Sequence, residues 1–280
     1  MSSPAPTWFI TGASSGLGRA LAEAVLARGW RAAMTARRPE TLADLTAEHG
    51  DRALALALDV TDSNSIAGAV HDAETHFGVI DVLVNNAGYG AVGSLEDLPI
   101  EDIEQLMRTN FLGAVNACQM VLPLMREQGH GKIILVSSIG ARIATPGAAV
   151  YYASKAAVSA LAESLAMEVG PFNIQVTAVE PGGMKTRFAE PASLKVATYD
   201  PAYEGMVGAT IAMMRSAEYA AALSDPRGHA GLVLKISELD EPPVRILAGA
   251  DAFAYGTQFD DMKNKSDIHW EELSKSATLA

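Results

Sequence analysis

Two adjacent tyrosines and a lysine in the stretch GAAVYYASKAAV, residues 147–158, have the side-chain types of an acid–base device. A free tyrosine has a pKa of roughly 10, and a nearby ammonium group lowers it by favouring the phenolate. On a helix, residues three and four apart are both neighbours, so Tyr151 and Tyr152 can each lie beside Lys155. The spacing predicts a general acid–base pair and leaves open which tyrosine belongs to it.

A glycine cluster in FITGASSGLGRAL, residues 9–21, ends an apolar run and opens a helical pattern. Its spacing, G-x-x-x-G-x-G, differs from the G-x-G-x-x-G of the best-known dinucleotide fingerprint. Glycines at such a turn let the backbone approach a pyrophosphate, and the N-terminus of the helix attracts that anion. Taken alone, an ordinary glycine-rich turn explains the cluster equally well. The cofactor contacts expected here are Gly12, Ser14, Ser15, Gly16, Leu17 and Gly18.

The residues after the second predicted strand favour a phosphorylated nucleotide. NAD-binding domains usually carry an acidic residue here for the ribose 2′-hydroxyl, but this chain reads Thr35-Ala36-Arg37-Arg38. A guanidinium pairs well with phosphate, so Arg37, and after it Arg38, predict NADP(H) in preference to NAD(H). The alternative is that both arginines are solvated residues before a helix start at PETL.

Seven short apolar runs alternate with helical patterns, which is typical of a parallel sheet covered on both faces. We expect an α/β fold, a single doubly wound Rossmann-type domain over 1–280. The predicted parts are a dinucleotide-binding and catalytic core at 7–182, a substrate loop with helices at 183–243, and a last strand with a C-terminal tail at 244–280. The predicted strands are 7–11, 31–36, 52–58, 81–86, 132–137, 174–180 and 244–249.

Helical periodicity covers the segments 15–29, 101–129 and 151–170, of which the second reads as one long helix or two abutting ones. The loop after residue 182 shows no strand pattern, and a loop of this length usually has a function. The polar tail after about residue 250 receives no assignment.

The composition of the chain indicates which kinds of binding partner are not expected. A formal net charge of −12 repels phosphate backbones, so nucleic acid is not an expected partner. No apolar run reaches the roughly 20 residues of a membrane helix, and the N-terminus lacks the pattern of a signal peptide. One cysteine and six scattered histidines show no metal-ligand spacing. We expect a cytoplasmic protein that binds neither metal, membrane nor nucleic acid.

Further motifs stand in a fixed order along the chain: NNAG at 85–88, Asn110 in RTNFLG, Ser138 thirteen residues before Tyr151, and PGGMKT at 181–186. With the glycine cluster and Y-x-x-x-K, they resemble the short-chain dehydrogenase/reductase family in its shorter, single-domain form, over residues 7 to about 190. The resemblance implies that the catalytic tyrosine is the one four residues before Lys155, which is Tyr151. Tyr152 is then expected to pack beside the site.

The same resemblance implies a reaction. Hydride passes between a nicotinamide and a carbonyl or secondary alcohol, with Tyr151 as the general acid/base. It implies that Ser138 and Tyr151 contact the substrate oxygen, that Lys155 also holds the nicotinamide ribose, and that Asn110 holds a water linking Lys155 to solvent. The other implied cofactor contacts are Asp59 and Val60 at the adenine, Asn86, Ala87 and Gly88 on the floor, Pro181 and Gly182, and Thr186 with the backbone near Met184 at the carboxamide.

Two other functions are compatible with parts of this pattern. A dinucleotide-sensing regulator on the same fold would usually lack the tyrosine or the lysine, and both are present. A sugar-nucleotide epimerase or dehydratase shares Y-x-x-x-K, but such chains are usually longer, with different glycine spacing. Consumption of cofactor with simple ketones separates the three.

The substrate and the assembly are predicted only in outline. An apolar pocket under a mobile lid, suited to a medium-sized apolar ketone or alcohol, is expected from Tyr89, Met184, Phe188 and Met206. A homodimer or homotetramer is expected because family members associate through the helices at about 103–128 and 152–169. The tail after residue 250 is then placed to block one of the two usual interfaces. The apolar residues that suggest an interface are Val115, Met120, Val158, Leu161, Leu165 and Met167.

Overall fold

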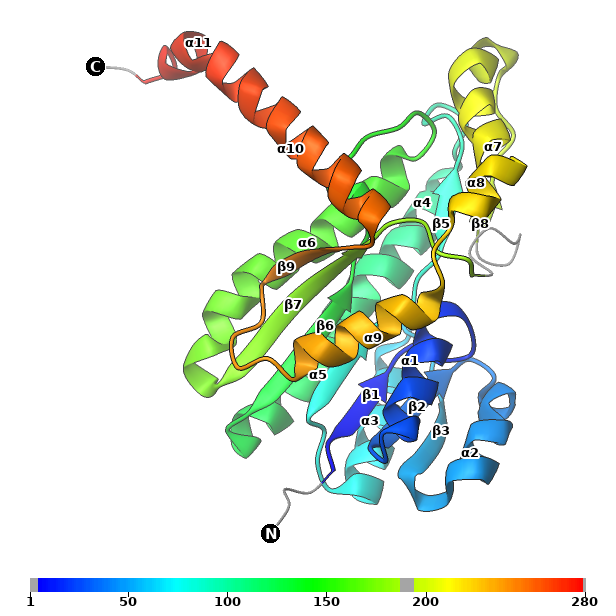
Figure 1. The fold of residues 1–280 in the computed structure, drawn as a ribbon, viewed down its shortest axis with the longest axis vertical. Coiled ribbons are helices and arrows are strands. Elements are labelled where there is room, and N and C mark those ends of the chain that lie inside the picture. The colour runs from blue at the N-terminus through cyan, green and yellow to red at the C-terminus, as the bar shows by residue number, and fades with distance from the viewer. Residues whose placement is uncertain (1–4, 187–193, 279–280) are drawn as a thin grey trace.

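The computed structural model of the chain describes residues 5–186 and 194–278 (Figure 1). Its centre is a seven-stranded, fully parallel sheet in the order β3-β2-β1-β4-β6-β7-β9. All seven predicted strands are confirmed, each end within one residue of its prediction. The strands are β1 (Thr7–Ile10), β2 (Arg31–Ala36), β3 (Ala53–Ala57), β4 (Val82–Asn85), β6 (Gly131–Val136), β7 (Ile174–Pro181) and β9 (Arg245–Ala248).

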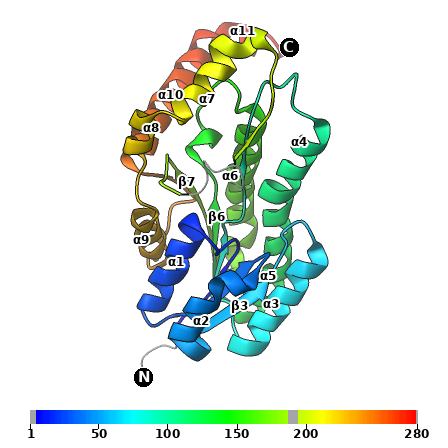
Figure 2. The same ribbon diagram turned by 90° about the vertical axis from the view of Figure 1, so that its right-hand side faces the viewer.

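Helices cover both faces of this sheet (Figure 2), which confirms the expected Rossmann-type fold. One face carries α1, α2 and α9, and the other carries α3, α5 and α6. The helices are α1 (Gly16–Ala27), α2 (Ala43–His49), α3 (Ser63–Phe77), α4 (Ile100–Met107), α5 (Gly113–Gln128), α6 (Ala149–Val169), α7 (Ala209–Met214), α8 (Ala217–Ala222), α9 (Pro226–Ser237), α10 (Ala250–His269) and α11 (Glu271–Lys275).

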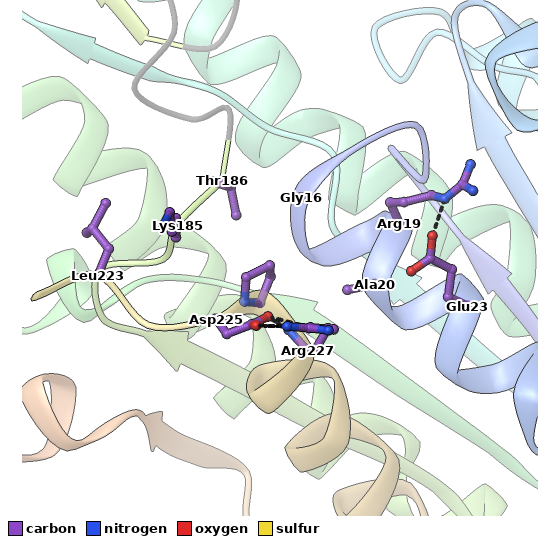
Figure 3. A pocket seen from close by; sticks show the side chains of 10 residues that line it. Gly16, Arg19, Ala20, Glu23, Lys185, Thr186, Leu223, Asp225 and Arg227 are labelled. Atoms are coloured by element: carbon purple, nitrogen blue, oxygen red, sulfur yellow. Dashed lines mark hydrogen bonds and ion pairs between the residues drawn. The ribbon is translucent and has the colours of Figure 1, made fainter. Parts of the chain in front are cut away.

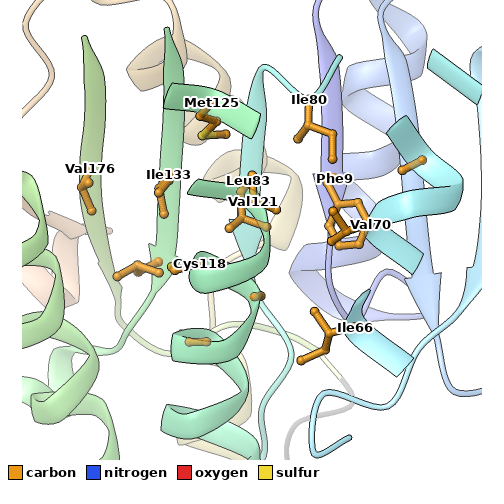
Figure 4. Packing of buried hydrophobic residues seen from close by; sticks show 14 of the residues in the cluster. Phe9, Ile66, Val70, Ile80, Leu83, Cys118, Val121, Met125, Ile133 and Val176 are labelled. Atoms are coloured by element: carbon orange, nitrogen blue, oxygen red, sulfur yellow. The ribbon is translucent and has the colours of Figure 1, made fainter. Parts of the chain in front are cut away.

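The strands are mostly apolar because both faces of the sheet are covered by helices. Successive side chains of a strand point to opposite faces. In β1, Phe9 therefore packs with the α3/α5/α6 layer, whereas Trp8 and Ile10 pack with the α1/α9 layer. Figure 4 shows the first layer, where Val121 of α5 and Val70 of α3 lie over the strands. The sheet edge that carries the site is therefore held by two separate cores.

The predicted helical run 101–129 contains a π-helical turn at Arg108–Leu112, between α4 and α5. The prediction left one helix or two abutting helices open, and the structure shows two α-helices in one continuous helical run. Single π-turns inside α-helices are frequent at functional sites. This turn carries Asn110, whose side chain is buried.

Two features of the fold were not predicted. A small parallel sheet pairs β5 (Gly90–Val92) with β8 (Leu194–Val196), so the loop after residue 182 does contain a strand. The unassigned tail is helical, because α10 and α11 occupy 250–275 and α10 projects away from the sheet (Figure 1).

Within the described residues, no helix is both long and apolar enough to cross a membrane.

Candidate active site

The predicted site residues gather at the carboxyl edge of the sheet. Gly12 follows β1, Asn86 follows β4, Ser138 follows β6, and Pro181 ends β7. In an open parallel sheet, ligands bind beyond this edge, where the strand order switches direction. Here the switch lies between β1 and β4, which begin the two outward-running halves of the sheet.

The glycine turn has the geometry that a pyrophosphate requires. Gly12 and Gly16 have φ angles of +67° and +58°, which glycine adopts without strain. A Cβ added at Gly18 would lie 2.5 Å from both Asn86 Nδ2 and Gly12 O, so α1 packs closely on the β4 loop. Ser15 precedes α1 and makes no side-chain cap, which leaves N–H groups of the first turn available to an anion. These residues fit a dinucleotide phosphate.

Asn86 has a structural task at this turn. Its Nδ2 donates to Thr11 O at 2.9 Å and to Gly12 O at 3.1 Å. Thr11 Oγ1 in return accepts from the backbone N–H groups of Asn86 at 2.9 Å and Ala87 at 3.0 Å. Sequence reasoning missed Thr11, and its one signal was its position between the strand and Gly12. Together these bonds hold the β1 turn against the β4 turn.

A cavity of ≈ 620 Å³ opens beside the glycine turn, between α1 and the start of α9 (Figure 3). Thr186 closes it on one side, since a Cβ at Gly16 would lie 3.4 Å from the Thr186 side chain. Arg19 lines the other side and is held by ion pairs with Glu23 and Asp44. The segment 181–186 thus lies next to the glycine turn, as a shared dinucleotide site requires.

The structure brings together the four side chains that the sequence predicted as a catalytic group. Tyr151 and Lys155 lie one turn apart on α6, and Tyr151 is hydrogen-bonded to Ser138. Asn110 Nδ2 donates to Ser154 Oγ at 3.1 Å, which ties the π-turn to α6. A Cβ at Gly88 would lie 3.0 Å from Asn110 Oδ1 and 3.5 Å from Lys155 Nζ, so both side chains reach the same point beside the β4 loop.

Tyr151 and Tyr152 make different contacts in the structure. The hydroxyl of Tyr152 lies 3.0 Å from Thr145 Oγ1. The Tyr152 ring covers Gly140, where an added Cβ would lie 2.3 Å from Cδ1. Tyr152 therefore packs under the turn that follows Ser138, while Tyr151 carries the hydroxyl that meets Ser138.

The pKa values of Tyr151 and Lys155 differ from the expectation. Burial raises the pKa of Tyr151 to about 12, and the hydrogen bond with Ser138 offsets only part of that rise. Burial also lowers the pKa of Lys155 to about 8. Burial, and not the charge of Lys155, dominates the pKa of Tyr151 in this chain, and Lys155 Nζ donates to Val136 O at 2.8 Å.

Lys155→Met is expected to stabilise the fold at neutral pH. Below pH 8 the buried ammonium of Lys155 destabilises the folded state. Between pH 8 and 10.5, Lys155 has lost its proton in the folded state but keeps it in the unfolded state. The free energy of unfolding of the wild type therefore rises with pH through this window. The variant lacks this titration. Denaturant unfolding should show a gain on the order of 2 kcal/mol at pH 7, after the lost hydrogen bond, which shrinks towards pH 10.5.

The exposed Lys265→Met is the control for removing one positive charge. A stability difference between Lys155→Met and wild type that stays constant from pH 7 to pH 10 would contradict a buried ammonium at Lys155.

The residues predicted to hold the adenosine end of a cofactor lie beyond β2 and β3. Arg37 and Arg38 are exposed, and in the described part of the chain neither guanidinium has a hydrogen bond or an ion pair. Asp59 accepts from Thr61 N and Thr61 Oγ1, and these bonds, with the charge of Arg37, lower the pKa of its carboxyl group. The Val60 side chain is buried against Gly113, which leaves only its backbone for a ligand.

The predicted substrate pocket is not assembled as expected. Met184 packs against the α1/α9 core, Tyr89 packs near Tyr151 and Leu106, and Met206 is 53% exposed. These three side chains belong to different surroundings, and Met184 lies near the start of α9 because it pairs with Ser224. Phe188, the fourth predicted residue, lies outside the described residues.

Comparisons with known proteins agree with this geometry. The model of the short chain dehydrogenase family matches residues 6–197. Oxidoreductase BOA17 of Botryotinia fuckeliana is 41% identical over 95% of this chain and 97% of its own. A short-chain dehydrogenase from Streptomyces avermitilis superposes with a TM-score of 0.91 at 36% identity, and the match covers 98% of this chain and 100% of that one.

Two other solved structures contain cofactors. A short chain dehydrogenase from Burkholderia cenocepacia J2315 in complex with NADP is 26% identical, with a TM-score of 0.74 over 96% of this chain and 98% of that one. The 3-ketoacyl-(acyl-carrier-protein) reductase from Brucella melitensis, complexed with NADH, is 26% identical, with a TM-score of 0.71 over 88% and 98%. The sheet, the glycine turn and these similarities lead to one conclusion: the chain belongs to the short-chain dehydrogenase/reductase family of oxidoreductases.

Proposed function

We propose that this protein is an NADP(H)-dependent oxidoreductase that interconverts a carbonyl compound and a secondary alcohol. The observation that carries the proposal is the hydrogen bond between Tyr151 and Ser138, beside a glycine turn that fits a dinucleotide. A binding protein without turnover would not need two hydroxyl groups aimed at one point. The regulator considered above is therefore the weaker reading.

Each residue of the group has a separate task in this reaction. The bound nicotinamide supplies or accepts the hydride. In the reductive direction Tyr151 donates its proton to the substrate oxygen, and Ser138 donates a hydrogen bond to the same oxygen. Burial raises the pKa of Tyr151 to about 12, so Tyr151 holds its proton at pH 7, as the general acid must, but releases it less readily than a free tyrosine. Lys155 and Asn110 form the polar wall behind Tyr151, next to Gly88.

The preference for NADP(H) is supported by what stands at the end of β2. Arg37 and Arg38 are exposed there, and no carboxylate occupies positions 35–38. Arg19, by contrast, is already neutralised by Glu23 and Asp44. A 2′-phosphate would therefore meet two guanidinium groups that no described side chain pairs, with Asp59 as the nearby charge of opposite sign.

The test is a screen of ketones and secondary alcohols with both cofactors, followed by nicotinamide absorbance. Apolar carbonyl compounds of medium size should be reduced with NADPH. Cofactor binding without turnover on any member of the panel would favour the regulator, and absence of cofactor binding would overturn the proposal.

The protein is also proposed to form a homodimer or homotetramer. The interface prediction is wrong for Val158 and Leu165, which are buried inside the chain. Met167 on α6 and Phe172 just beyond it remain exposed, at 83% and 46%. Light scattering at micromolar concentration should give at least twice the 29.4 kDa chain mass, and Met167→Glu should shift the mass towards the monomer. A monomeric wild type would refute this assembly.

A further inference from the structure

Two side chains beyond residue 197, outside the part of the chain that the family model matches, hold the backbone of the 181–186 segment. Ser224 Oγ donates to Gly183 O at 2.8 Å, and the Ser224 N–H donates to the same oxygen at 3.0 Å. Asp251, in the first turn of α10, accepts from Gly183 N at 2.8 Å through Oδ2. Lys185 N donates to Ser224 O at 2.7 Å. Both polar groups of the Gly183 backbone are therefore held from the C-terminal third of the chain.

His229 fixes the orientation of Ser224. It is 4% exposed, and its Nε2 lies 2.7 Å from Ser224 Oγ. The serine hydroxyl has one proton, which it donates to the Gly183 carbonyl. Its oxygen must therefore accept from His229, which requires a proton on Nε2. Burial lowers the pKa of His229, which favours the neutral form at pH 7.

The glycines around this cluster leave no room for side chains. A Cβ at Gly182 would lie 2.1 Å from Asp251 Oδ2, and a Cβ at Gly249 would lie 2.8 Å from Asp251 Oδ1 and 3.4 Å from His229 Cε1. The close fit means that the carboxylate of Asp251 and the segment 182–183 have one mutual arrangement.

A serine, a histidine and an aspartate also make up hydrolytic triads, but this geometry does not suit a nucleophile. The Ser224 proton is committed to a backbone carbonyl. The carboxylate of Asp251 accepts from Gly183 N, and in the described residues it has no hydrogen bond with His229. In a triad the carboxylate would instead orient the imidazole. The arrangement serves to hold a loop.

We propose that Ser224, His229 and Asp251 are positioning residues for the nicotinamide end of the cofactor. This proposal rests on the function proposed above. Ser224, His229 and Asp251 together form a clamp, which sets the path of residues 182–185. That path places Thr186 against Gly16, so that the segment forms one wall of the dinucleotide site. A clamp released at Ser224 would leave the adenosine half of the site unchanged and would loosen only the nicotinamide half.

Ser224→Ala tests this division, with Ser216→Ala as the matched control. Ser216 caps α8 through Tyr219 N and makes no contact with the clamp. The KM for NADPH should rise about three- to tenfold in Ser224→Ala, the range for one lost hydrogen bond, and kcat should fall. The affinity for adenosine 2′,5′-bisphosphate, which lacks the nicotinamide, should stay within about twofold. Ser224→Thr, which keeps the hydroxyl, should restore the KM.

Hydrogen exchange gives a readout that does not depend on activity. The Gly183 and Lys185 amides should exchange faster in Ser224→Ala than in wild type or Ser216→Ala. Unchanged exchange, or an equal loss of affinity for NADPH and for the adenosine fragment, would overturn the clamp. If wild type neither binds nor oxidises NADPH, the proposed function fails, and the exchange experiment still tests whether the clamp exists.

Discussion

Tyr151→Phe is expected to lower kcat by about 10²–10⁴-fold, the usual contribution of general acid–base catalysis. The change removes the hydroxyl that meets Ser138 and keeps the ring, so the packing against Val150 and Leu106 remains. Cofactor affinity should change little, because the glycine turn and Arg37 are untouched. Steady-state kinetics with NADPH and a ketone from the screen, together with a fluorescence titration of NADPH, measure both quantities.

Tyr152→Phe is the matched control, since it removes the same group one residue away. Its hydroxyl bonds Thr145, and its ring stays over Gly140, so most activity should remain. Equal losses of kcat in the two variants would show that the hydroxyl near Ser138 has no special role. The assignment of Tyr151 as the general acid would then be wrong.

Wild type is expected to prefer NADPH over NADH by about ten- to a hundredfold in kcat/KM. A charge-assisted contact to the 2′-phosphate contributes about 1.5–3 kcal/mol, which corresponds to that ratio. Arg37 is exposed, so the preference should weaken as salt rises. The ratio of kcat/KM for the two cofactors, measured at low and high salt, provides the check.

Arg37→Leu should remove most of this preference, and combining it with Ala36→Asp should reverse it, because a carboxylate accepts the 2′-hydroxyl and repels the phosphate. Ala36 is 5% exposed at the end of β2, so the double variant also needs a thermal melt to show that it folds. Arg126→Leu, on the last turn of α5 at the opposite edge of the sheet, is the matched control. A wild type that uses NADH as well as NADPH would leave Arg37 as a surface residue and refute the NADP(H) proposal.

Much of the fold could be predicted because its signals are local. A strand that is buried on both faces is mostly apolar, so the seven strands stand out as separate runs in the sequence. The tight turn after β1 needs glycine at positive φ, so Gly12 and Gly16 are visible without a structure. The residues of the Y-x-x-x-K motif are one helical turn apart, which brings Tyr151 and Lys155 to one face of α6.

The electrostatics of the site depended on contacts that the motif does not contain. Whether a tyrosine gains or loses acidity is decided by the burial and the hydrogen bonds around it. In this chain Lys155 donates to Val136 on a neighbouring strand, and burial raises the pKa of Tyr151. A spacing rule cannot supply either fact.

The tertiary structure alone decided which distant segments meet. The tail after residue 250 has weak amphipathic character, so its helical structure could not be predicted. In the structure, α10 begins just after β9 and brings Asp251 to Gly183, 68 residues earlier. Ser224 reaches Gly183 across 41 residues in the same way. Periodicity and spacing report on neighbours along the chain, whereas these contacts arise because the segment before α9 and the first turn of α10 both pack against the residues that follow β7. The sequence therefore determined the sheet, the glycine turn and the candidate catalytic residues, and the packing determined what holds the loop beside them.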